Sequence, residues 1–181
     1  MSDALTDLNG TLCDVWARLE NGAAVPGSPA NLPVLATASP SGGAARIVVL
    51  RGVDRSAQTL WFYSHAAASK VADLKANSRA ELLIWDPRDR LQIRLGVSID
   101  LGTVSADVWD GLGPGTRLNY ATDPLPGTKI DDPSDAQQAT PQHHQMVLLT
   151  AHIARIETLQ ITNDGLRRAV FEGSTSRWIA P

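Results

Sequence analysis

The chain has 181 residues, of which 43% are hydrophobic and 19% charged, and its formal net charge is −3. This composition excludes an intrinsically disordered chain, and the lack of a basic excess argues against nucleic acid as the main partner. The single cysteine, Cys13, rules out a disulfide within the chain, and the sequence contains neither a signal peptide nor an apolar run long enough to span a membrane. We therefore expect a cytoplasmic protein that folds as a single domain over residues 1–181, with no nucleic-acid or membrane partner.

The N-terminal segment has the spacing of an amphipathic helix. Between residues 3 and 20, apolar side chains recur at steps of three and four: Leu5, Leu8, Leu12, Val15, Trp16 and Leu19. The pair Asn21-Gly22 is a typical stop signal, so this spacing predicts a helix within residues 1–22.

Short β-type runs follow, separated by turn residues. They cover residues 33–39, 45–53, 59–63, 80–85, 91–97, 99–105 and 146–156, with further short runs at 159–162 and 169–171. One short helix is expected at 67–77 and another from Ser105, a good N-cap, to Gly111. Residues 111–145, rich in Gly, Pro, Asp and Gln, are predicted to form a long loop. Many short strands with few helices indicate a mostly β (α+β) chain, an antiparallel barrel with peripheral helices.

The common catalytic and metal-binding motifs are absent from the sequence. There is no HExxH, CxxC, Walker loop or GxSxG motif. His143 and His144 are adjacent in a polar stretch, and neighbouring side chains do not converge readily on one metal ion, so we predict no metal site there. The segment GLGPGTR (residues 111–117) lacks the Lys-Ser/Thr ending of a phosphate loop and is interpreted as a plain loop.

Anion-binding chemistry instead concentrates between positions 46 and 94. Arg46 and Arg51 flank the apolar run in RIVVLRGVD, and Ser69-Lys70 opens a predicted helix, whose N-terminus favours phosphate. Because Arg46 and Arg51 are an odd number of residues apart, a regular strand would point them to opposite faces. We therefore expect them to contact different parts of a ligand, although spacing alone leaves open that both are surface arginines at strand ends.

A second polar feature lies in the segment LQIRLG. There Gln92 and Arg94 alternate with apolar residues and therefore share one face of the predicted strand. The carboxamide of Gln92 can donate and accept at once, which suits the edge of a heterocycle such as a flavin pyrimidine. The alternative is a side chain that simply faces solvent.

Taken in order, five segments resemble the FMN-binding split-barrel proteins related to pyridoxamine 5′-phosphate oxidase. They are RIVVLRGVD, LWFYSHAAASK, LKANSRAELLIWDP, LQIRLGVSIDL and RWIAP. The resemblance runs from about residue 33 to the C-terminus, and its most specific part is the stretch 46–97. It implies an antiparallel, six-stranded, Greek-key-like split β-barrel, a homodimer, and FMN in a cleft between the two subunits.

The resemblance also implies a set of cofactor contacts, carried over by position. These are Arg46, Ile47, Val48, Val49, Leu50 and Arg51 along the flavin, then Tyr63 and Ser64, then Ser69 and Lys70 at the phosphate, and Gln92 at the ring edge.

The departures from the family pattern concern the phosphates of both cofactor and substrate. In the family pattern an Arg-Lys pair holds the FMN phosphate, whereas this chain has Ser69-Lys70 at that place. Arg51 stands where the true oxidases carry a lysine. A tyrosine and an arginine that hold the substrate phosphate fall on Trp109 and Gly113.

Two further departures lie near the C-terminus. An Arg-x-His pattern becomes Leu166-Arg167-Arg168, and a tryptophan of the flavin site becomes Leu159. Loss of the arginine that binds the substrate phosphate, at the position of Gly113, removes a contact worth about 1.5–3 kcal/mol. We therefore expect a substrate other than pyridoxine phosphate, unless Arg117 or Arg168 substitutes.

Three hypotheses for the function remain. The first is an FMN-dependent oxidase or reductase acting on an unidentified small molecule, with Trp109, Arg117 and Arg168 as candidate substrate contacts and no catalytic side chain assigned. The second is a non-catalytic flavin-binding or redox-sensing protein, in which Trp109 and the 111–145 loop cover the cofactor. The third is a small-ligand barrel without flavin.

Overall fold

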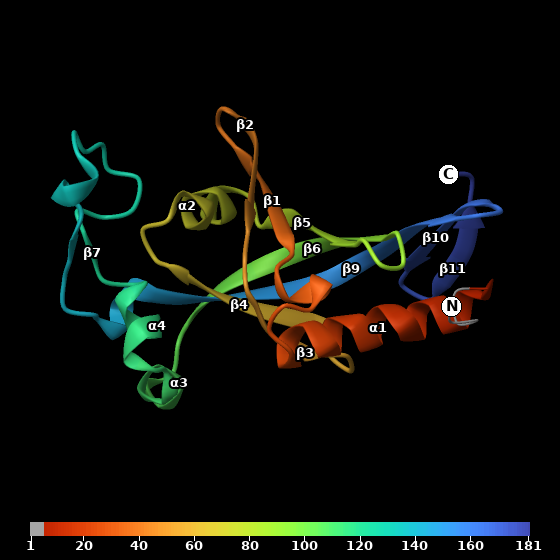
Figure 1. Ribbon diagram of the computed structural model, residues 1–181, viewed down its shortest axis with the longest axis horizontal. Coiled ribbons are helices and arrows are strands. Elements are labelled where there is room, and N and C mark those ends of the chain that lie inside the picture. Colours follow the sequence, from red (N-terminus) through yellow and green to blue (C-terminus); the bar gives the residue numbers. More distant parts are fainter. Residues whose placement is uncertain (1–5) are drawn as a thin grey trace.

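The structure, a computed structural model, describes residues 6–181 and is built around one antiparallel sheet (Figure 1). Nine strands are connected in the order β11-β10-β9-β6-β5-β1-β2, while β4 pairs with β9 and carries β3 at its other edge. The strands are β1 (Val34–Ser39), β2 (Gly42–Ile47), β3 (Leu50–Asp54), β4 (Thr59–His65), β5 (Arg79–Asp86), β6 (Leu91–Thr103), β9 (Met146–Thr162), β10 (Gly165–Glu172) and β11 (Thr175–Ile179). The expected mostly β, antiparallel class is confirmed. The sheet connects nine strands where six were expected, since the C-terminal hairpin β10–β11 extends it and one predicted strand is divided in two.

Strands β6 and β9 are the longest of the sheet and lie side by side. Their pairing runs from Leu91 opposite Gln160 to Thr103 opposite Val147. Alternate residues of β6 are buried: Leu91, Ile93, Leu95, Val97 and Ile99. The sequence predicted two separate strands in each of these regions. Instead, each region forms one continuous strand, and the pairing of β6 with β9 shifts its register between Gly96 and Val97.

Helix α1 (Leu8–Ala24) packs against the barrel core and differs from its prediction at its C-terminal end. It begins after Asp7, whose side chain caps it, and it continues past the expected stop at Gly22. Gly22 is buried against Ala30, and a Cβ at Gly22 would lie 2.6 Å from the Ala30 carbonyl carbon. The glycine therefore permits close packing rather than ending the helix. Leu5, part of the predicted helix, lies outside the described residues.

The predicted strand over residues 45–53 is divided into β2 and β3, which is a correction. The chain leaves β2 after Ile47, and the Val48 N–H donates to the Pro33 carbonyl at 3.0 Å. Val48 and Leu50 are buried in the core, so β3 turns away to pair with β4 instead of continuing along β1. Arg46 thus lies in β2 and Arg51 in β3.

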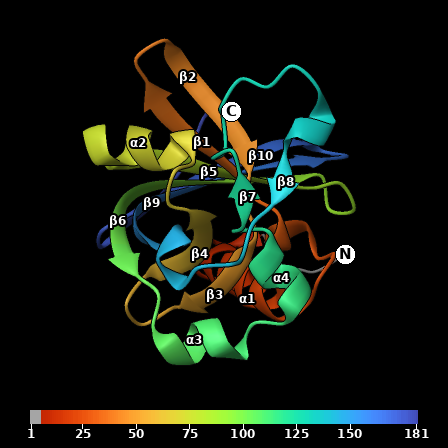
Figure 2. The same cartoon turned by 90° about the vertical axis from the view of Figure 1, so that its left-hand side faces the viewer.

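Helix α2 (Ser69–Ala76) lies on the opposite side of the β6–β9 ribbon from α1 (Figures 1 and 2). Its buried residues Val71, Asp73 and Leu74 face the barrel, and its main contacts are with β1 and β6. The first turn of α2 is thereby placed beside the C-terminal end of β4, to which a short turn connects it.

The region 111–145, predicted as a loop, contains local structure, which is a second correction. Before it, α3 (Ala106–Gly111) forms as predicted, and Ser105 Oγ accepts the Val108 N–H at 3.3 Å. The region itself holds α4 (Pro114–Leu118), the hairpin of β7 (Thr122–Asp123) and β8 (Gln137–Gln138), and the 3-10 turns η3 (Pro133–Asp135) and η4 (His143–Gln145). A further 3-10 turn, η2, covers Pro29–Asn31. Proline at the first position of α4 explains why a Gly/Pro-rich sequence starts a helix there. Figure 2 looks onto the end of the molecule where these elements lie.

Two groups of buried apolar side chains lie inside this arrangement. The larger fills the barrel beneath α1, and the smaller consists of Val104, Trp109, Tyr120 and Met146 between α3, α4 and the start of β9. Within residues 6–181, no helix is both long enough and apolar enough to cross a membrane.

Candidate functional site

Five of the residues around the end of β4 form a polar group that we call the Lys70 cluster: Arg46, Ser64, His65, Ser69 and Lys70. β4 ends at His65, and the Ala68 N–H donates to the His65 carbonyl at 3.0 Å, so that α2 starts directly afterwards. Ser64 and His65 are buried, while Ser69, the first residue of α2, is exposed. The cluster therefore combines a helix N-terminus with several side-chain donors.

Lys70 is the half-buried cation of this cluster. Its Nζ donates to Ser64 Oγ at 3.3 Å, and no carboxylate of residues 6–181 forms an ion pair with it. Burial lowers the pKa of Lys70, and the like charge of Arg46 lowers it further. Lys70 thus holds a positive charge that the described part of the protein does not neutralise.

Arg46, in contrast, is fixed by its own partners. Its guanidinium donates to Thr37 Oγ1 at 2.6 Å and to the Leu35 carbonyl at 3.3 Å, and it reaches the carboxylate of Asp73 at 3.4 Å. Asp73, on the buried face of α2, also accepts the Thr37 hydroxyl at 2.8 Å. Arg46 therefore ties β2 to β1 and α2, and its charge is balanced.

His65 was missed in the sequence analysis, yet it is buried within the cluster, with 8% exposure. Its Nδ1 accepts the Ala67 N–H at 3.0 Å, so the proton of the neutral ring must sit on Nε2. Nε2 is buried and has no hydrogen-bond partner among residues 6–181. Burial, and then the charge of Lys70, lower the pKa of the imidazole. In the sequence, only the position of His65 directly after Ser64, at the end of a predicted strand, could have indicated it.

The segment Ile47–Arg51 alternates between core and surface. Val48 and Leu50 are buried, whereas Ile47 is 63% exposed and Val49 36% exposed. Arg51 is exposed and makes no hydrogen bond or ion pair within the described residues. The segment thus presents two apolar side chains outward, on the face opposite to its core contacts, together with a guanidinium that has no partner in residues 6–181. The spacing argument for Arg46 and Arg51 assumed one regular strand, and it does not apply because the two residues lie in different strands.

A second polar group surrounds Trp109 at the end of the molecule that carries α3 and α4. The Arg117 guanidinium lies 5.5 Å from the centre of the Trp109 ring, and the His143 ring lies 5.6 Å from it. A cavity of about 350 Å³ opens here, lined by Trp109, Pro114, Arg117, Leu118 and Pro141. Arg117 Nη2 donates to the Asp110 carbonyl at 2.6 Å, but its buried Nε has no partner in residues 6–181. The sequence-predicted pair Trp109 and Arg117 is therefore brought together, at a mainly apolar cavity.

Tyr63 connects this cavity to the Lys70 cluster. It precedes Ser64 on β4 and packs against the small apolar group that contains Trp109 and Tyr120. Burial raises the pKa of Tyr120, and the nearby charge of Arg51 acts in the opposite direction. Arg51, Tyr63 and the Trp109 cavity consequently lie on one side of the molecule.

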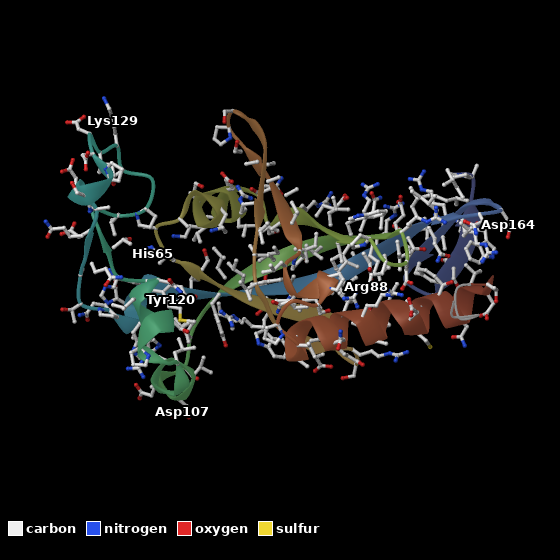
Figure 3. All side chains as sticks on the ribbon, viewed as in Figure 1. His65, Arg88, Asp107, Tyr120, Lys129 and Asp164 are labelled. Atoms are coloured by element: carbon white, nitrogen blue, oxygen red, sulfur yellow. The ribbon has the colours of Figure 1, made fainter. Side chains whose placement is uncertain are left out.

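Gln92 and Arg168, also predicted as site residues, lie far from Lys70 within one chain. Gln92 and Arg168 flank Leu159 on neighbouring strands. Ser64 is opposite Val147, which is opposite Thr103, eleven residues further along β6 than Gln92. At about 3.3 Å per residue, this is roughly 35 Å along the strand. In Figure 3, His65 lies toward the left, and Arg88, in the turn before Gln92, toward the right.

Arg168 belongs to a group that we call the Glu157 cluster: Arg94, Arg155, Glu157 and Arg168. The Glu157 side chain is only 3% exposed and is contacted by all three arginines. Arg168 donates to Glu157 Oε1 from Nε at 2.9 Å and from Nη2 at 2.6 Å. Burial alone would raise the pKa of Glu157, but the hydrogen bonds from Arg168 and Arg155 outweigh burial and lower it.

The histidines do not gather into a metal site. Within residues 6–181, no group of three or more His, Cys, Asp or Glu side chains is arranged to hold a metal ion. His143 Nε2 is instead 2.6 Å from the Val104 carbonyl, and His144 is exposed.

Comparison with known proteins places residues 28–110 in the sequence family described as pyridoxamine 5′-phosphate oxidase. No curated protein sequence matches the chain. Among solved structures, a pyridoxamine 5′-phosphate oxidase-related, FMN-binding protein from Nostoc punctiforme is 20% identical, with a TM-score of 0.73. The match covers 93% of this chain and 96% of that one.

Two further solved structures resemble the chain. PhzG from Burkholderia lata, in complex with tetrahydrophenazine-1-carboxylic acid, is 17% identical, with a TM-score of 0.74 and coverage of 100% of this chain and 98% of that one. A structure named F420 reductase is 17% identical, with a TM-score of 0.50 and coverage of 77% and 93%. At these identities the likeness concerns the fold, and it confirms the expected split barrel.

Proposed function

We propose that the chain belongs to the pyridoxamine 5′-phosphate oxidase-related split-barrel family, whose sequence pattern its residues 28–110 match, and that it binds FMN and acts as an FMN-dependent oxidoreductase. The observation that carries the proposal is the unbalanced Lys70 cluster. A half-buried ammonium without a carboxylate partner in residues 6–181 and a serine at a helix N-terminus both call for an anion. The terminal phosphate of FMN supplies such an anion.

The residues of the cluster fit the cofactor in distinct ways. Lys70 and Ser69 would hold the phosphate. Arg46 would fix the position of α2 relative to β1 and β2 through its contacts with Thr37 and Asp73. The outward face of Ile47–Arg51 and the ring of Tyr63 would lie along the flavin. When bound, the flavin supplies the redox chemistry, and the protein supplies position and electrostatics. Arg51, which has no hydrogen-bond or ion-pair partner in residues 6–181, would stabilise negative charge near the ring.

A complete site requires two copies of the chain. FMN is much shorter than the roughly 35 Å of strand that separate the Lys70 cluster from Gln92. Apolar side chains near the two regions are nevertheless exposed, with Ile47, which follows Arg46 in β2, at 63% and Trp85, opposite Gln92, at 47%. A homodimer that covers these side chains would bring Gln92 of a second copy to the flavin edge, together with Arg168.

We further propose that the Trp109 cavity binds the substrate, a flat and mostly apolar molecule that carries an acidic group. The aromatic and proline lining suits an apolar ring system, and the buried Nε of Arg117, which is unpaired within residues 6–181, calls for an acceptor. Tyr63 places this cavity next to the proposed flavin position. The carboxylic acid ligand of the structurally similar PhzG supports a substrate of this class.

The direct test is an absorption spectrum of the purified protein, followed by mass identification of whatever denaturation releases. We expect an oxidised-flavin spectrum, with FMN as the released compound. Bleaching by a reduced nicotinamide would favour an oxidoreductase over a purely flavin-binding or redox-sensing protein. A colourless protein that fails to bind added FMN would contradict the proposal.

The shared site is tested by mixing two defective variants. Lys70→Met and Gln92→Leu should each bind FMN poorly as pure homodimers. A refolded mixture contains heterodimers in which one site carries both substitutions and the other carries neither. We therefore expect part of the tight FMN binding to return in the mixture, up to one intact site per heterodimer. No recovery in a mixture that demonstrably forms heterodimers would contradict a two-chain site.

A further inference from the structure

One polar atom of the Lys70 cluster has no assigned role. His65 Nε2 is buried, carries the ring proton because Nδ1 is engaged by the Ala67 N–H, and lacks an acceptor in residues 6–181. Buried donors in folded proteins are almost always paired with protein, ordered water or a ligand. The imidazole N–H therefore identifies a place where an acceptor must bind.

The surroundings of His65 indicate the charge of that acceptor. Lys70 is near enough to lower the pKa of the imidazole, and Arg46 acts on Lys70 in the same sense. The Lys70 ammonium donates a hydrogen bond to the hydroxyl oxygen of Ser64, which is next to His65 on β4. A neutral N–H donor beside an ammonium that forms no ion pair within residues 6–181 is a setting for an anionic oxygen, which both groups can bind at once.

We propose that His65 is a cofactor-binding residue whose Nε2–H donates to a phosphate oxygen of FMN. This inference rests on the proposed function and deepens it. His65 supplies the third donor of the phosphate site, after Lys70 and Ser69. It thereby offsets the loss of a cationic side chain at position 69, where the family pattern has arginine and this chain has serine.

The test compares FMN with riboflavin, which has the same ring system and no phosphate. Flavin-free protein is titrated with each ligand by calorimetry or fluorescence for the wild type, His65→Leu and His65→Gln. Leucine removes the donor, while the glutamine amide can place an N–H where Nε2 stood. His152→Leu is the matched control, because His152 is exposed and pairs with Asp100 on the outer side of β9.

We expect His65→Leu to weaken FMN binding about tenfold and to leave riboflavin binding unchanged. His65→Gln should stay within about threefold of the wild type, and His152→Leu should have no effect. An unchanged FMN affinity in His65→Leu would show that ordered water satisfies Nε2 and would overturn the inference. Equal weakening of FMN and riboflavin would assign His65 a structural role and would also overturn it.

A second measurement does not depend on a variant that must fold. In the ¹⁵N NMR spectrum of the wild type, FMN should shift the His65 Nε2 signal and riboflavin should not. Equal shifts with both ligands would contradict the phosphate contact. A wild-type protein that binds neither ligand would overturn the proposed function itself, whereas a wild type that binds FMN without any effect at His65 would overturn only this inference.

Discussion

The Lys70 cluster and the Glu157 cluster both gather positive side chains on the same sheet, but they differ in whether each cation has an acidic partner. In the Glu157 cluster, three guanidinium groups surround one buried carboxylate, and Arg94 also pairs with Glu81. In the Lys70 cluster, Asp73 balances Arg46, while Lys70 and the Nε2–H of His65 have no acidic partner in residues 6–181. Each guanidinium of the first cluster thus has a carboxylate partner, whereas Lys70 has none among residues 6–181, which points to a ligand.

The largest effect should come from removing the carboxylate at the centre of the Glu157 cluster. We expect Glu157→Gln to lower the free energy of unfolding by about 3 kcal/mol, because three guanidinium groups lose their shared counter-charge. Urea unfolding measures this loss. Glu81→Gln, at the exposed rim of the same network, should cost less than about 1 kcal/mol. Equal, small losses in both variants would mean that Glu157 contributes no more than a surface ion pair.

The Glu157 cluster should also make the stability of the protein depend on pH. The pKa of folded Glu157 lies below its ordinary value, so its stabilisation is fully present above that ordinary value and is lost as the pH falls through the lower, folded pKa. The stability gap between wild type and Glu157→Gln should therefore be constant from about pH 5 to 7 and shrink below about pH 4. A gap that widens in acid would show that the sign of the pKa shift is wrong.

The Lys70 cluster should respond in the opposite way. We expect Lys70→Met to weaken FMN binding about 30-fold, which is about 2 kcal/mol, without lowering the free energy of unfolding of the flavin-free protein. The reason is that Met removes a half-buried cation that lacks a carboxylate partner in residues 6–181. Lys75→Met is the control, since Lys75 is exposed in the last turn of the same helix. A stability loss without a change in FMN affinity would reverse the roles of the two clusters.

The smallest effect concerns Arg168, which the sequence analysis named as a substrate contact and the structure places against Glu157. Arg168→Leu should lower the free energy of unfolding by about 1 kcal/mol, because Glu157 keeps two other guanidinium partners. Arg177→Leu, at an exposed pair with Glu172, should change it by less than about 0.5 kcal/mol. Thermal unfolding of both variants checks the difference, and a larger loss for Arg177→Leu would be incompatible with it.

Local patterns in the sequence were sufficient for much of the fold. The alternation of apolar residues in β6 and the N-cap at Ser105 depend only on neighbours along the chain, and both are found as predicted. The division of the 45–53 run into β2 and β3 depends on which strands its two halves pair with. Gly22 was misinterpreted for a similar reason, because its close contact with Ala30 is tertiary.

In the candidate site, too, the features that depend on neighbours in sequence could be predicted, and those that depend on tertiary structure could not. Ser69 and Lys70 are adjacent in sequence, so their association with a helix N-terminus could be predicted. The roughly 35 Å of strand between Ser64 and Gln92 follows from the register of β4, β9 and β6, which no short motif contains. The proposed role of His65 rests on the burial of Nε2 without a hydrogen-bond partner among residues 6–181, which no sequence pattern contains.

The most direct test of the proposed site is the affinity difference between FMN and riboflavin in wild-type protein and Lys70→Met. If the Lys70 cluster holds the phosphate, flavin-free wild type should bind FMN at least about a hundredfold more tightly than riboflavin, and Lys70→Met should reduce that ratio to a few-fold. Equal affinities for FMN and riboflavin in the wild type would contradict a phosphate site at Lys70.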